Sequence, residues 1–130
     1  MDTDLAFLRE RVVGYAGYGD EAARHASDKR VRAFVGEALA DVQAASEAAL
    51  DGPTQDALSA TLLRCEFGDM QFIRRLDHAA LDARESDALV RADRGLVELA
   101  ERARGAAPAD LPAIVAGIRT LFDRRELQPD

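Results

Sequence analysis

Apolar residues recur along almost the whole chain at intervals of three and four positions, the period of an amphipathic helix. No stretch alternates apolar and polar residues for long enough to indicate a strand, and runs of β-branched residues are few. The pattern therefore predicts an all-α fold, an antiparallel bundle of about five helices.

Glycine and aspartate mark the limits of the first helices. A first helix is expected to begin near Asp4 and to end in residues 14–19, where three glycines in six positions disfavour a helix. Asp20 is placed to cap the second helix. That helix either runs unbroken to Leu50 or restarts at residues 27–28.

A Gly-Pro pair at residues 52–53 ends the second helix, and Thr54 is the expected cap of a third helix that runs to about Leu81. A fourth helix is expected to begin at residues 86–87, and a last one after Asp110. Short connections predict that consecutive helices pack antiparallel. The third helix has an apolar stripe with further hydrophobic residues beside it: Leu58, Leu62, Cys65, Phe72 and Leu76 on the stripe, and Leu63, Phe67 and Met70 alongside.

Composition and charge narrow the classes of function. The 130 residues fit one domain that covers positions 1–130. A net charge of −7 argues against a nucleic-acid interface and a basic membrane anchor, so neither partner is expected. The N-terminus is acidic and the uncharged stretches are short, so we expect a soluble cytoplasmic protein. One cysteine excludes a disulfide framework within the chain and a zinc site built on cysteines.

Asp69 is the clearest anomaly in the pattern, because it falls near the centre of the third helix's apolar stripe. A carboxylate that faces the bundle interior needs a partner, since burying it alone is costly. Two kinds of partner are open: an arginine or other hydrogen-bond donor, or a metal ion shared with further carboxylates. The adjacent Gly68 also has two interpretations, a close approach of two helices or a passage for a ligand.

Three other acids could join Asp69 around a metal ion. Glu66 lies three residues before it, and Glu37 and Asp41 are four apart on the preceding helix. With about 1.5 Å of rise per residue, an antiparallel hairpin that turns at residues 52–53 brings all four acids to a similar level. Oxygen ligands of this kind suit Mg²⁺ or Mn²⁺.

The segment Glu66-Phe67-Gly68-Asp69-Met70-Gln71-Phe72 resembles the E-x-G-D-x-x-F segment of MazG-like all-α nucleoside triphosphate pyrophosphohydrolases. In that family the acids bind Mg²⁺, which activates water and positions the triphosphate for release of pyrophosphate. Glu66 and Asp69 match the family's E-x-x-D pair. The resemblance covers about residues 31–94 and implies a nucleotide substrate and Mg²⁺ as cofactor.

The resemblance is incomplete on the preceding helix, where the family carries an E-E-x-x-E motif. Glu37 and Asp41 match its first and last acids. Ala38 stands where the second glutamate belongs, and Asp41 is shorter than a glutamate. The departures put the metal site in doubt and leave a degenerate, non-hydrolytic relative as part of this alternative.

Other polar and aromatic residues have structural interpretations. Tyr15 and Tyr18 form either a mobile lid or, as we favour, a turn plugged by aromatic rings. Asp28 and Arg32 are four apart, which is typical of an ion pair on an exposed helix face. Cys65 lies on the apolar stripe and is expected to be a buried, inert thiol.

No complete set of catalytic residues stands out in the sequence. We therefore expect a small helical-bundle protein that acts through protein–protein contacts, without catalysis or a cofactor, and as a homo-oligomer. The alternative is a divergent or degenerate MazG-like pyrophosphohydrolase. Under that alternative alone, nucleotide is a partner and Mg²⁺ is held by Glu37, Asp41, Glu66 and Asp69.

Overall fold

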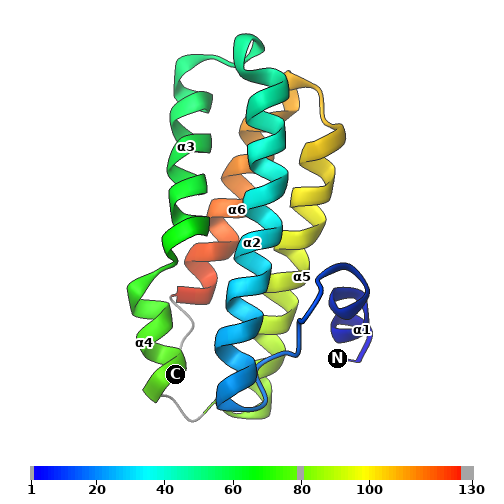
Figure 1. The fold of residues 1–130 in the computed structure, drawn as a ribbon, viewed down its shortest axis with the longest axis vertical. Helices are drawn as coiled ribbons and strands as arrows, with labels where there is room; N and C mark the ends of the chain where they lie inside the picture. The colour runs from blue at the N-terminus through cyan, green and yellow to red at the C-terminus, as the bar shows by residue number, and fades with distance from the viewer. Residues whose placement is uncertain (1, 79–80, 127–130) are drawn as a thin grey trace.

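The computed structural model describes residues 2–78 and 81–126, and most of this range is helical (Figure 1). The described residues contain no strand, so the predicted all-α fold is confirmed. Within the same ranges, no helix has the length and apolar content needed to cross a bilayer. The elements are α1 (Asp2–Arg11), α2 (Glu21–Ser46), η1 (Glu47–Ala49), α3 (Gly52–Phe67), α4 (Met70–His78), α5 (Ala83–Gly105), η2 (Pro108–Asp110) and α6 (Leu111–Glu126), where η marks a 3₁₀ turn.

Four long helices form a bundle, and α4 extends it below α3 (Figure 1). In that view α2 and α5 run upward while α3 and α6 run downward, so α2 and α3, and α5 and α6, are antiparallel. Helix α2 packs against α3 and α5, and α6 packs against the same two helices. Helices α3 and α5 therefore occupy opposite corners of the bundle. Helix α1 lies outside it, against α5.

Aspartates begin three of the helices. The carboxylate of each accepts a hydrogen bond, 2.8 Å long, from the backbone amide three residues further on. Asp20 caps α2 as predicted, and α2 does not restart at residues 27–28 but is unbroken as far as Ser46, short of the predicted end at Leu50. Gly52 and Pro53, which were expected to end this helix, begin α3 instead. The caps of α3 and α5 are Asp51 and Asp82, so the predicted caps at Thr54 and at residues 86–87 are wrong.

The predicted third helix is in fact two helices, separated at Gly68 and Asp69. Gly68 has a φ of +76°, a left-handed conformation that glycine adopts without the steric cost of a side chain. Its amide donates a hydrogen bond of 2.8 Å to the carbonyl of Arg64 and ends α3. The prediction of one continuous helix is therefore wrong. Gly68 terminates α3, and the side chain of Arg32 on α2 approaches it closely.

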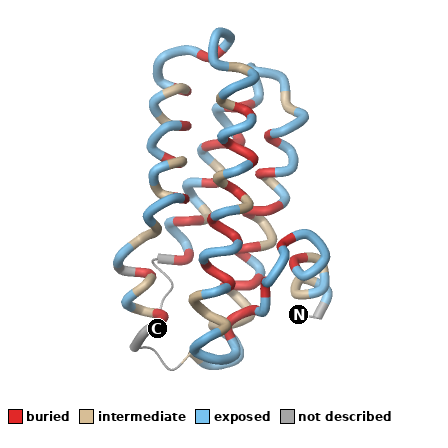
Figure 2. The backbone as a smooth tube through the Cα atoms, in the orientation of Figure 1, coloured by how far each residue is buried: buried red, intermediate tan, exposed pale blue. Residues whose placement is uncertain are grey.

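The hydrophobic core follows the inner faces of the four bundle helices (Figure 2). On α3 fewer residues of the predicted stripe are fully buried than expected, because Leu62 is only partly buried. Leu63, Phe67 and Met70, which were expected beside the core stripe, are 57%, 68% and 64% exposed. Among the residues of α3 and α4 whose side chains the structure describes, the buried ones are Thr54, Leu58, Thr61, Cys65, Phe72 and Leu76.

Replacement of Gly68 by alanine is expected to destabilise the protein by about 1–3 kcal/mol. The φ of Gly68 disfavours a side chain, and a Cβ there would lie 3.1 Å from both the guanidinium carbon of Arg32 and Cδ1 of Ile73. In a continuous helix the same change would stabilise the protein by about 1 kcal/mol. Urea unfolding measures the sign, with Gly105→Ala as control because a Cβ there meets nothing within 4 Å. A more stable Gly68→Ala variant would contradict the break.

Candidate functional site

A cluster of charged side chains is buried at the end of the bundle where α2 begins and α6 ends. Arg125, close to the end of α6, is 1% exposed and is the largest fully buried side chain in the described ranges. Its guanidinium donates hydrogen bonds to Asp28 on α2 and, at 2.9 Å, to Asp93 on α5. One arginine therefore connects three helices.

Three further side chains donate to the two carboxylates. Arg32 donates to Asp28 through Nε at 3.1 Å, so Asp28 lies between two arginines. The hydroxyls of Tyr15 and Tyr18 both donate to Oδ2 of Asp93, at 2.9 and 2.6 Å. Two acids and two arginines balance in charge, and the two hydroxyls add two donors to Asp93. Nε of Arg125 is buried without a hydrogen-bond partner.

Aromatic rings enclose the cluster and attach the turn between α1 and α2 to the bundle. The ring of Tyr18 meets those of Tyr15 and Phe72 edge-on, with centroids 6.5 and 6.4 Å apart. The guanidinium of Arg125 lies 4.3 Å from the centroid of Phe72. The hydroxyl of Ser27 bonds two backbone groups of the turn. The interpretation of this turn as plugged by its tyrosines is confirmed.

Burial controls the protonation of the cluster. Burial, and then the charge of Asp93, raises the pKa of both Tyr15 and Tyr18 well above the usual value. Burial also raises the pKa of Asp93, against the opposing charge of Arg125. Burial disfavours the charged form of Arg125 and so lowers its pKa. The electrostatic effects of Tyr18, Asp93 and Asp28 outweigh burial and hold the pKa of Arg125 above its ordinary value. The tyrosines are therefore neutral and the arginine charged at neutral pH.

Sequence reasoning missed this cluster, and one of its predictions here is wrong. Asp28 and Arg32 are 2% and 8% exposed, not an ion pair on a solvated face. The signal that could have found the cluster is the one that singled out Asp69. Asp93 lies at helical spacing between Leu89 and Leu96 on the inner face of α5.

Two of the four candidate metal ligands are held by arginines. Nε of Arg64 donates to both carboxylate oxygens of Asp69, at 2.8 and 3.0 Å, so an arginine is the observed partner of this anomalous acid. Arg64 also pairs with Asp123 on α6 at 2.8 Å. Asp41 is exposed and pairs with Arg104 on α5 at 2.6 Å.

The other two candidate ligands, Glu37 and Glu66, are exposed and line one groove of about 360 Å³ between α2 and α3. Arg32 and Cys65 line the groove as well, and Arg32 donates to the Cys65 carbonyl at 2.8 Å. Burial raises the pKa of the Cys65 thiol to about 12, so the thiol stays protonated and unreactive. In the described part of the chain, no group of three or more His, Cys, Asp or Glu residues is placed to hold a metal ion.

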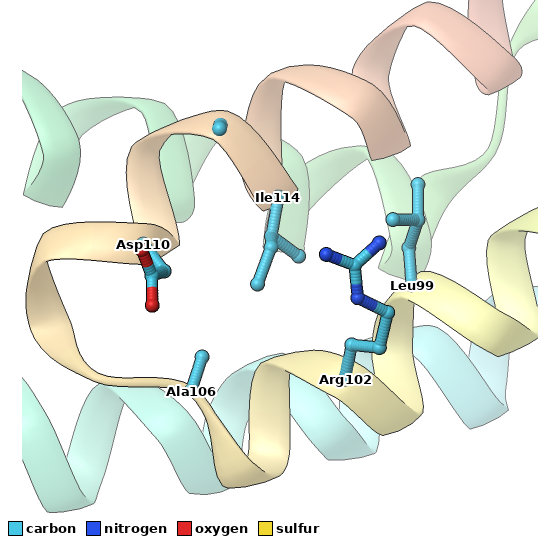
Figure 3. A pocket seen from close by; sticks show the side chains of 6 residues that line it. Leu99, Arg102, Ala106, Asp110 and Ile114 are labelled. Atoms are coloured by element: carbon cyan, nitrogen blue, oxygen red, sulfur yellow. The ribbon is translucent and has the colours of Figure 1, made fainter.

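A second hollow, of about 410 Å³, lies at the turn between α5 and α6 (Figure 3). Leu99 and Ile114 form its apolar wall, and Arg102 and Asp110 are exposed at its edge. The other lining residues are alanines. One acid and one base at the surface, without a nucleophile among the lining residues, give this hollow no catalytic chemistry.

Exposed large hydrophobic side chains gather at the end of α3 and the start of α4. Four large hydrophobic side chains are exposed among the described residues: Val13, Leu63, Phe67 and Met70. Three of the four lie between residues 63 and 70. Leu63 and Phe67 are one turn apart on the same face of α3, and Met70 begins α4. This surface is a candidate site of protein contact.

Replacing Arg125 with methionine is expected to destabilise the protein by about 3–5 kcal/mol, because Asp28 and Asp93 lose the cation that neutralises them inside the bundle. Urea unfolding measures the loss. Arg124→Met is the matched control, since Arg124 is the exposed neighbour. A loss for Arg125→Met no larger than for Arg124→Met would contradict the structural role of the cluster.

Both tyrosines of the chain belong to the cluster, and tryptophan is absent. Because folding raises both tyrosine pKa values, their contribution to stability is complete below pH 10.0 and is lost as the pH rises above it. The loss is about 1.4 kcal/mol per pH unit for each tyrosine. Tyrosinate absorbance in an alkaline titration should therefore appear only as the helical circular dichroism disappears. Ionisation near pH 10.0 in a protein that stays helical would contradict the burial.

Comparison with known proteins assigns the chain to no family. No family model, no curated protein and no solved structure matches it. The function proposed below therefore depends on the contacts described above.

Proposed function

We propose that this chain is a soluble, cytoplasmic helical-bundle protein that acts through contact with other proteins, as a homo-oligomer, and not through catalysis. The exposed apolar surface at Leu63, Phe67 and Met70 is the observation that supports this most directly. Large apolar side chains gathered at an exposed site are typical of surfaces that another protein covers. A helix face with one-turn spacing suits packing against a second helix.

The ion pairs that the interior carboxylates form support the same proposal. Asp28 and Asp93 are buried and neutralised by Arg125 and its neighbours. Asp69 is held by Arg64 in a pair with 14% and 18% of the side chains exposed. These carboxylates stabilise the fold through ion pairs, so they are not presented to a substrate.

One observation favours the MazG-like alternative: Glu37 and Glu66 line the same groove. Under this alternative, Glu37 and Glu66 would be the first ligands of Mg²⁺. Asp69 and Asp41 could join them only if the ion pairs with Arg64 and Arg104 opened. The alternative therefore needs a rearrangement of α3 and α5 side chains that protein contact does not need.

We expect no release of pyrophosphate when the protein is incubated with a panel of nucleoside triphosphates and Mg²⁺ or Mn²⁺. The reason is that two of the four candidate ligands are engaged by arginines. Calorimetric titration of the nucleotide-free protein with each metal tests the site separately, and we expect no saturable heat.

Matched variants make this assay decisive. Glu66→Gln removes a carboxylate from the groove, and Glu47→Gln removes an exposed one from the far end of α2. Pyrophosphate release that Glu66→Gln abolishes and Glu47→Gln preserves would overturn the proposal in favour of the enzyme.

A further inference from the structure

We propose that two copies of this chain pair through one stripe on the outside of α3 and α4, antiparallel to each other about a two-fold axis. The proposal rests on the function proposed above and names the partner as a second copy. We call this surface the outer stripe. Its six residues are all exposed: Asp56, Ala60, Leu63, Phe67, Met70 and Arg74.

The outer stripe has the spacing of a coiled-coil seam. Its residues follow each other at alternating intervals of four and three positions from Asp56 to Arg74. On α3 they fall within a sector about 60° wide, on the side opposite the buried residues Leu58 and Cys65. Helix α4 lies below α3 after a kink in the chain (Figure 1). On α4 the exposed Met70 and Arg74 lie opposite the buried Phe72 and Leu76, so the stripe extends onto it. A second helix could lie along this surface.

The apolar part of the outer stripe is complementary in shape to the same surface of a second copy. In a two-fold antiparallel pair, residues equally distant from the axis along the helix face each other. With the axis at the level of position 65, Leu63 faces the partner's Phe67. Ala60 then faces the partner's Met70, so the smallest residue of the stripe meets the long, adaptable methionine. Each large side chain is matched without a clash of two aromatic rings.

The charged ends of the outer stripe select the direction and the partner. Asp56 lies at one end and Arg74 at the other, and each is nine residues in sequence from position 65 (65 − 56 and 74 − 65). Antiparallel pairing therefore brings Asp56 against the partner's Arg74 at both ends of the interface. Parallel pairing would place like charges together, which disfavours it. An interface between identical surfaces requires this self-complementarity, and the outer stripe has it in size and in charge.

Sedimentation velocity of the full chain, from low to high micromolar concentration, tests the pairing. We expect a reversible dimer, and we expect Phe67→Glu to raise its dissociation constant by about thirtyfold or more. Val13→Glu is the matched control. Val13 is 87% exposed, and among the large exposed hydrophobic residues of the described ranges it alone lies outside the stripe. A monomer at all concentrations would overturn the inference, as would equal weakening by the two variants.

A charge exchange tests the antiparallel register. Asp56→Arg and Arg74→Asp each place two like-charge pairs in the dimer and should weaken it by about tenfold. The double variant restores opposite charges and should recover the wild-type dissociation constant. Failure of the double variant to recover would overturn the register. Since the nucleotide assay is independent, a monomeric chain without pyrophosphate release would remove this inference and the homo-oligomer of the proposed function, and would leave contact with other proteins in place.

Discussion

The charge of Arg125 is the constraint on which the rest of the structure depends. A guanidinium inside a protein must be matched by carboxylates and hydrogen bonds, because burying it unpaired would cost more than the fold can supply. Asp28 and Asp93 provide that match from two other helices. The three helices are therefore fixed in relative position at one end of the bundle by a single side chain.

The buried cluster also affects the surface proposed for contact, through Arg32. Arg32 pairs with Asp28 on one side and donates to the carbonyls at the end of α3 on the other, which is the favourable place for a cation at a helix C-terminus. Its guanidinium occupies the space that a side chain at position 68 would need. The break at Gly68 thus fits around the buried cluster, and the break sets where α4 begins and where Met70 stands.

Helical periodicity and residue type were sufficient to predict the fold class, the Asp20 cap and the glycine-rich turn before it, but not the break at Gly68 or the place of Gly52 and Pro53 at the start of α3. They were not sufficient for the cluster, because Asp28 and Arg125 are far apart in sequence and only the packing of both α2 and α6 against α5 brings them together. The exposed residues were misplaced for a different reason. Leu63 and Phe67 were expected beside the core because they are large and apolar, although their helical phase is opposite to that of the buried Leu58 and Cys65. Asp69 was found because a carboxylate on an apolar face stands out locally, although its partner Arg64 was not identified.

The coupling between Arg125 and Asp93 is the most direct measure of the central claim that the interior charges hold the fold. A double-mutant cycle with Arg125→Met and Asp93→Asn, read by urea unfolding, isolates the energy that the two residues share. We predict a coupling of about 2–3 kcal/mol in favour of the wild-type pair. Losses that add within about 0.5 kcal/mol would contradict the claim, because independent residues behave in that way.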